Sequence, residues 1–88
     1  MTGTAITGGD GSSVEQAIVI NATSSRIGVP EEYNYIERTC GQCDVDYTIK
    51  GQTLYEQNDR QYDVISVKQK DGSKRDFWFD ITSFYGKF

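Results

Sequence analysis

The residues of this chain that are best suited to chemistry are its two cysteines, Cys40 and Cys43, which form a Cys-x-x-Cys pair in the segment RTCGQCD. Such a pair can act as a dithiol redox centre or supply half of a zinc site. In dithiol oxidoreductases the reactive thiol lies at a helix N-terminus, where the helix dipole stabilises the thiolate. Here the order is reversed, because Cys40 is expected in the last turn of a helix that stops at Gly41.

The composition also weakens a zinc site. The chain has two cysteines and no histidine, so a tetrahedral site would need a second subunit or nearby carboxylates. We therefore expect no cofactor, and we interpret Cys40 as a small core residue and Cys43 as a partly exposed thiol at a strand start. The alternative is a dimeric thiol protein that binds zinc or cycles its redox state through Cys40 and Cys43.

Catalysis without histidine would have to rely on carboxylates, because His is the commonest general base. Asp63 and Asp80 are expected to face each other on neighbouring strands, where they could act as a pair or bind a cation. We expect them instead to point into water at the strand ends, since nothing in the sequence indicates a cleft. The chain is accordingly predicted to be no enzyme, with no catalytic residue.

Size and charge restrict the remaining functions. The 88 residues carry a net charge of −4, and we predict a flexible tail over residues 1–13 and a single α+β domain over residues 14–88. An acidic surface repels phosphate backbones, which argues against nucleic acid. A domain this small rarely encloses a deep pocket, which argues against a small-molecule ligand. No apolar stretch approaches the ~20 residues of a membrane span, and the cytoplasm is the expected compartment.

The clearest helical segment is VPEEYNYIERTCG, residues 29–41. Pro30 suits the first helical position, and Gly41 suits a left-handed stop. Val29, Tyr33, Ile36 and Cys40 share one stripe that should face a core, and Glu32 should point away from it.

The remaining chain has the pattern of strands. Residues 17–20 form a short apolar run, and residues 45–50 alternate between apolar and polar, with Gly51-Gln52 read as a turn into the strand segment 53–56. The segment QNDR, residues 57–60, turns the chain again, and the strand segments 62–68 and 75–81 follow. We predict an antiparallel meander of four to five strands, with the one main helix packed on one face.

The last hairpin decides which residues reach the surface. A two-residue turn at Asp71-Gly72 pairs Val64 with Phe79 on the core side. The other face then carries the pairs Ile65–Trp78, Val67–Asp76 and Asp63–Asp80. A three-residue loop would shift this register and reverse the assignment.

We therefore predict a small acidic protein-binding module that docks on a larger protein with a basic surface, as inhibitors, immunity proteins and phage counter-defence proteins do. Whether the chain also forms a dimer is left open. The predicted contact has Trp78 as its anchor, two aliphatic neighbours and three steering carboxylates: Trp78, Ile65, Val67, Asp63, Asp76 and Asp80.

Two features leave alternatives. The basic residues Lys68, Lys70, Lys74 and Arg75, which crowd the hairpin tip beside Phe77 and Trp78, would suit RNA binding. The C-terminal aromatics Phe84, Tyr85 and Phe88 either fold back over an edge of the core or form a partner contact.

Overall fold

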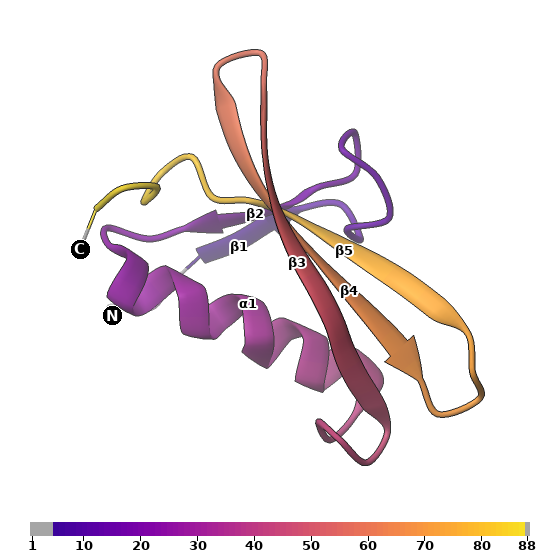
Figure 1. Ribbon diagram of the computed structural model, residues 1–88. Coiled ribbons are helices and arrows are strands. Elements are labelled where there is room, and N and C mark those ends of the chain that lie inside the picture. Colours follow the sequence, from indigo (N-terminus) through magenta and orange to yellow (C-terminus); the bar gives the residue numbers. More distant parts are fainter. Residues whose placement is uncertain (1–4, 88) are drawn as a thin grey trace.

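The structure is a computed structural model in which residues 5–87 are described, as five strands and one helix (Figure 1). These elements are β1 (Ala5–Gly8), β2 (Ile18–Asn21), α1 (Ser25–Cys40), β3 (Tyr47–Gln57), β4 (Arg60–Gln69) and β5 (Lys74–Asp80).

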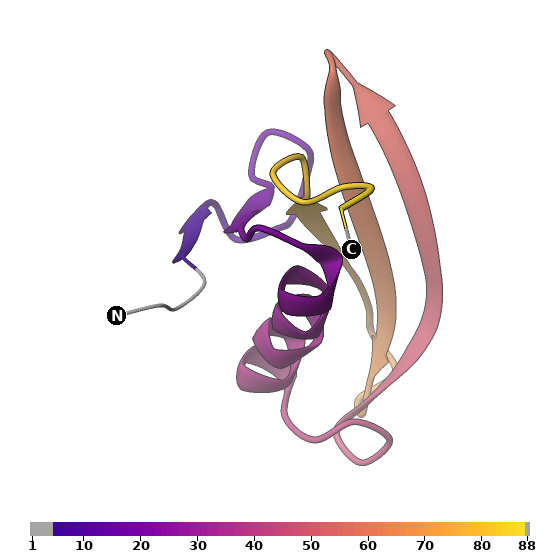
Figure 2. The ribbon, with the colours of Figure 1, turned by 90° about the vertical axis from the view of Figure 1, so that its left-hand side faces the viewer.

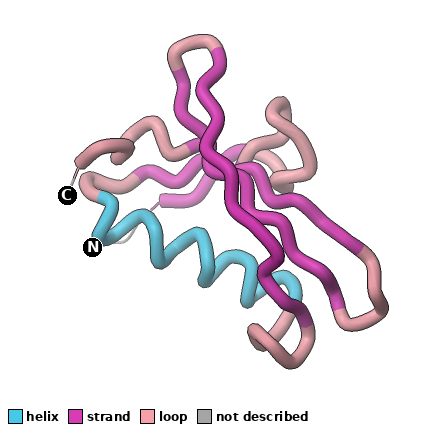
Figure 3. Tube along the Cα trace, viewed as in Figure 1, coloured by secondary structure: helices cyan, strands magenta, loops and turns pink. Residues whose placement is uncertain are grey.

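The strands form one mixed sheet with the order β1-β2-β5-β4-β3. Neighbouring strands are antiparallel except β2 and β5, which run parallel, with Ile18 opposite Phe79. The predicted α+β class is confirmed, but the prediction of a purely antiparallel meander is wrong. Helix α1 carries the chain from β2 to the far edge of the sheet, so the β3-β4-β5 meander returns to lie beside β2 (Figures 1 and 3).

Helix α1 covers one face of the sheet (Figure 2). Ile36 is fully buried there, and the ring of Tyr35 packs edge-on against Phe77 and Phe79, with centroids 6.3 and 6.0 Å apart. Edge-to-face packing of this kind is favourable for aromatic rings. The core between the helix and the sheet is completed by aliphatic and aromatic side chains: Ile18, Ile20, Tyr47, Ile65, Val67, Ile81 and Phe84.

The helix begins four residues earlier than predicted, at Ser25, and Pro30 lies inside it. Its buried residues are Gly28, Glu32 and Ile36, so the expectation that Glu32 points away from the core is wrong. The side that faces the core is shifted because Gly28 allows close packing. A Cβ atom at this position would lie 2.5 Å from the ring of Phe84. The predicted position of the helix end is confirmed, and Gly41 donates its N–H to the carbonyl of Glu37; its φ of 108° is positive, but with ψ −152° it is not the left-handed conformation that was expected.

Strand β3 is continuous where the sequence predicted a turn at Gly51-Gln52. The register with β4 shifts between Ile49 and Gly51, which makes Lys50 the extra residue of a β-bulge. The next turn was predicted correctly: Asn58 and Asp59 both have positive φ and connect β3 to β4 as a two-residue loop.

The β4–β5 hairpin has the register that the sequence analysis treated as the alternative. Gln69 donates its N–H to the carbonyl of Ser73 over 2.8 Å, so the loop contains three residues, the last of them Gly72 with φ 92°. The observed pairs include Val64 with Trp78 and Ile65 with Phe77. The predicted pairing is therefore wrong by one residue: β5 keeps its predicted orientation, whereas β4 turns its other side toward the helix.

The N-terminal segment participates in the sheet. Residues 5–8, which we assigned to a flexible tail, form β1, where Ile6 pairs with Ile20. Further along, the carbonyl of Gly11 accepts a hydrogen bond from the N–H of Trp78 over 2.8 Å. Residues 1–4 of the predicted tail lie outside the described part of the chain.

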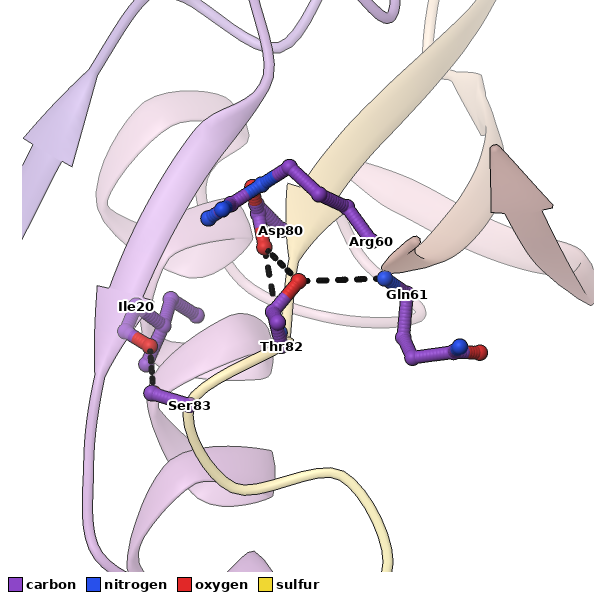
Figure 4. Close-up of polar contacts among 6 residues, drawn as sticks. All are labelled: Ile20, Arg60, Gln61, Asp80, Thr82 and Ser83. Atoms are coloured by element: carbon purple, nitrogen blue, oxygen red, sulfur yellow. Dashed lines mark hydrogen bonds and ion pairs between the residues drawn. The ribbon is translucent and has the colours of Figure 1, made fainter. Parts of the chain in front are cut away.

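The C-terminal segment is anchored by polar contacts at the end of β5 (Figure 4). Asp80 accepts a hydrogen bond from the Nε of Arg60 over 2.6 Å and two from Thr82, and the Thr82 hydroxyl accepts the N–H of Gln61. Ser83 donates its hydroxyl to the carbonyl of Ile20. These contacts position Phe84 in the core.

Asp80→Asn should lower the free energy of unfolding at pH 7 by about 1–3 kcal/mol. Burial raises the pKa of Asp80, but the hydrogen bonds from Arg60 and Thr82 outweigh it and leave the pKa below its ordinary value. The stabilisation is therefore present above pH ~4 and lost as the pH falls through the folded-state pKa. Urea titrations at pH 7 and pH 3 measure this difference. An equal effect of the substitution at both values would contradict an electrostatic role.

Candidate docking surface

The face of β3, β4 and β5 opposite α1 is the open face, and no helix within residues 5–87 covers it (Figure 2). Trp78 lies at the centre of this face, and its side chain is half-buried. The alternation of side chains along each strand and the observed register assign to the open face Thr53, Tyr55, Tyr62, Val64, Ser66, Asp76, Trp78 and Asp80.

Three aromatic rings from three strands form the centre of the open face. The indole of Trp78 stacks on Tyr55, with centroids 5.2 Å apart and an interplanar angle of 25°. It also meets Tyr62 edge-on at 6.1 Å. Tyr62 and Val64 are buried, whereas Tyr55 is 47 % exposed. The cluster therefore combines a buried base with an accessible aromatic rim, which suits contact with a partner.

The structure separates the six predicted contact residues into two groups. Trp78, Asp76 and Asp80 lie on the open face, as the sequence analysis expected. The other three lie on the opposite face, beneath the helix, where they are buried: Ile65, Val67 and Asp63. The predicted cluster is therefore not assembled. The cause is the three-residue loop, which moves every β5 partner by one position.

The carboxylates on the open face differ in availability. Asp76 is exposed and accepts a hydrogen bond from the hydroxyl of Ser66 over 2.7 Å. Asp80 is nearly buried and neutralised by Arg60. Asp76 is therefore the one of the two acids whose charge a partner can reach directly.

Sequence reasoning missed Tyr55 and Tyr62 as parts of the surface. Tyr62 was placed on the core face by the two-residue turn. Tyr55 was placed in a separate strand after a turn at Gly51-Gln52. Periodicity gives no signal for them, because Leu54 and Tyr55 are adjacent and residues 51–57 do not alternate between apolar and polar.

A polar cluster lies under the helix on the covered face. The side-chain amide of Gln52 donates to both oxygens of Asp63, over 3.0 and 2.8 Å, and the Tyr33 hydroxyl donates to Gln52 over 3.1 Å. Glu32 is 0 % exposed, and neither of its carboxyl oxygens has a partner in hydrogen-bonding geometry. Burial, followed by the neighbouring carboxyl of Asp63, raises the pKa of Glu32 to about 10.

This cluster changes the interpretation of the acidic residues. Asp63 lies opposite Phe79 and Asp80 lies opposite Tyr62, so the expected Asp63–Asp80 pair does not form. The carboxyl that Asp63 approaches is Glu32. At neutral pH Glu32 is therefore protonated. Full burial of Glu32 keeps it from contact with a substrate, so the pair has the properties of a structural group rather than of a catalytic one.

The two cysteines are free thiols. Cys40 is half-buried against the core, and burial raises its pKa, which is the opposite of the change that activates a thiol. Cys43 is exposed and lies near Tyr47, whose pKa rises to about 12 through burial and then the nearby Cys43. Within residues 5–87 no three His, Cys, Asp or Glu side chains are grouped closely enough to hold a metal ion.

The basic hairpin tip does not form an aromatic platform with Phe77. The guanidinium of Arg75 lies 4.5 Å above the Phe77 ring, and that ring is fully buried beneath the helix. A nucleic-acid base therefore cannot stack on it. Lys68 and Lys74 are paired across the hairpin, and such like-charge pairs are unfavourable.

Over the described residues 5–87, no helix is long and apolar enough to cross a membrane. No protein-family model, curated protein or solved structure matches this chain.

Proposed function

We propose that this chain is a protein-binding module that docks on a larger protein through its open face and performs no catalysis of its own. The observation that carries the proposal is the stack of Trp78 on Tyr55, which leaves nearly half of the Tyr55 side chain accessible on a face without a helix. Aromatic residues of this kind provide large contact area at a low cost in conformational entropy.

The proposed partner has a basic surface. The net charge of −4 would attract such a partner over long range, and the exposed carboxylate of Asp76 lies beside the aromatic cluster. Inhibitors, immunity proteins and phage counter-defence proteins act in this way, by occupying a surface of a larger protein. Asp63 has no part in this contact, because it lies beneath the helix.

The two alternatives remain open to direct tests. A thiol function would require stoichiometric zinc or a reactive thiolate, which elemental analysis and a thiol titration would detect. RNA binding through the hairpin tip would require retention on RNA that falls steeply with salt. Neither the raised pKa of Cys40 nor the burial of Phe77 supports them.

Tyr55→Ala should weaken partner binding at least about 30-fold, as expected for an aromatic hot spot worth ~2 kcal/mol. Tyr85→Ala is the matched control, because Tyr85 is 45 % exposed but lies in the C-terminal turn. The measurement is affinity capture from a lysate of the source organism with and without nuclease, followed by quantitative mass spectrometry. Proteins that wild type and Tyr85→Ala retain should be lost from Tyr55→Ala.

The position of Trp78 provides a second readout. It is the only tryptophan of the chain, so its fluorescence should respond when a purified partner covers the open face. Binding that is equal for wild type and Tyr55→Ala, with unchanged Trp78 emission, would place the contact elsewhere on the molecule. Circular dichroism of both variants confirms that the fold is retained.

A further inference from the structure

Strand β3 forms an edge of the sheet, because its only neighbour among the described strands is β4. Residues 50–60 are all exposed, including Leu54 at 53 %. Figure 1 shows the β3–β4 ribbon extending past the ends of the other strands, so this part of the edge stands clear of the helix. The edge is therefore physically accessible to another strand.

The hairpin register fixes which main-chain groups point outward. Gln57 and Arg60 flank the two-residue turn and should exchange both of their hydrogen bonds, and the pattern alternates from there. Tyr55 and Thr53 then bond to β4. Gln52, Leu54 and Glu56 direct their N–H and C=O groups away from β4, toward the open edge.

Beyond the β-bulge at Lys50, this edge carries little of the usual protection against strand pairing. Residues 51–57 contain no proline, and Glu56 is the only charged residue among them. Natural sheets commonly protect edges with prolines, charges, bulges or very short strands. The opposite edge is protected by a very short strand, because β1 contains only four residues, whereas β3 contains eleven.

We propose that β3 pairs antiparallel with β3 of a second copy of this chain, about a two-fold axis through Thr53. Thr53 then lies opposite its own counterpart, and Gln52 lies opposite Leu54. Lys50 of each copy meets Glu56 of the other, and Tyr55 packs over Gly51. Because the interface is symmetric, each of the latter pairs occurs twice.

Side-chain orientation and charge select this register from its neighbours. Pairing must place open-face residues opposite open-face residues. The two-fold axis must therefore pass through a residue, not between two residues, and the neighbouring possibilities are axes at Gln52 and Leu54. An axis at Leu54 would place Lys50 opposite Asn58 of the turn, and an axis at Gln52 would place it opposite Leu54. Thr53 is the position that brings the opposite charges of Lys50 and Glu56 together and covers the glycine with an aromatic ring, two stabilising cross-strand contacts.

The dimer would join two five-stranded sheets into one and place the two open faces side by side. Tyr55 takes part in both contacts, because its ring stacks on Trp78 in the docking surface and packs over Gly51 in the dimer. The dimer still does not depend on the proposed docking function, because its hydrogen bonds come from the main chain of the strand edge. The Thr53→Cys and charge-reversal tests leave Tyr55 unchanged, so they separate failure of the dimer from failure of docking.

A disulfide across the axis tests the register directly. In a Cys43→Ser background, Thr53→Cys should oxidise to a covalent dimer, because opposed residues of antiparallel strands lie within disulfide range. Gln57→Cys is the matched control, exposed on the same strand face but roughly 26 Å from its counterpart in the proposed dimer. Cross-linking no faster for Thr53→Cys than for Gln57→Cys would overturn the proposal.

Charge reversal provides an independent test by sedimentation equilibrium. Glu56→Lys and Lys50→Glu should each raise the dimer dissociation constant about tenfold, since each places like charges in contact twice. Combining them should restore the wild-type constant. A wild-type chain that stays monomeric at millimolar concentration, or a dimer insensitive to these changes, would overturn the proposal.

Discussion

Glu32→Gln is expected to raise the free energy of unfolding at pH 7 by about 3 kcal/mol, which corresponds to a rise in Tm of roughly 10 °C or more for a domain of this size. The carboxyl of Glu32 is buried without a regular hydrogen bond, and its pKa rises from an ordinary value of 4.5 to about 10. At pH 7 unfolding therefore releases the proton of Glu32, and this release favours the unfolded chain. Gln cannot ionise, keeps the shape, and can donate its amide to Asp63.

The same argument fixes the pH dependence. Between pH ~4.5 and ~10 the folded wild type holds one proton more than the unfolded chain at Glu32, so stability falls by up to ~1.4 kcal/mol per pH unit as the pH rises. The groups facing Glu32 are Asp63 and, through Gln52, Tyr33, whose pKa is raised by burial and then by Asp63 and Glu32. The Gln variant should lack this slope.

Urea titrations at pH 5, 7 and 9 measure the effect. Glu37→Gln, on the exposed side of the same helix, is the control, and it should change stability by less than ~0.5 kcal/mol. If the gap between wild type and Glu32→Gln did not widen from pH 5 to pH 9, burial of a protonated Glu32 would be excluded.

Phe84→Ala is expected to destabilise the protein by about 3–5 kcal/mol, a large part of the stability of a domain this small. Phe84 is 1 % exposed, and its ring lies against Gly28 of the helix. Alanine would leave a cavity that the surrounding backbone cannot fill, because the helix and the sheet fix the space around it. The loss should appear as a large drop in Tm by circular dichroism.

Tyr85→Ala provides the comparison within the same turn. Tyr85 is exposed, so its truncation should change stability by less than ~0.5 kcal/mol. Similar effects of the two substitutions would indicate that the C-terminal segment does not pack on α1. The structure thus divides the aromatic tail: Phe84 belongs to the core, Tyr85 lies at the surface, and Phe88 is outside the described residues.

Several elements could be predicted because their signals are local. The branched run at residues 17–20 corresponds to β2, the segments near 62–68 and 75–81, rich in branched and aromatic residues, correspond to β4 and β5, and Gly41 ends the helix. Each depends on side-chain periodicity or on the conformational preference of one or two residues. The turn at Asn58-Asp59 is of the same kind, since Asn and Asp tolerate positive φ.

The candidate surface required information that the sequence did not contain. One additional loop residue before Ser73 moves Ile65, Val67 and Asp63 beneath the helix and leaves Trp78 on the open face. Tyr55 joins Trp78 only because β3 continues through Gly51. A register shift of one residue exchanges the faces of a whole strand, and loop length of this kind is decided by packing rather than by the turn residues alone.

By itself, then, the sequence determined the acidic charge, most of the strand-forming segments, the end of the helix and the turn at Asn58-Asp59, because these depend on residues close together in the chain. The tertiary structure alone decided that β2 runs parallel to β5, that Glu32 is buried beside Asp63, and that β3 forms an open edge. These features depend on which surfaces meet when the helix crosses the sheet, and burial of the shared apolar core selects that arrangement.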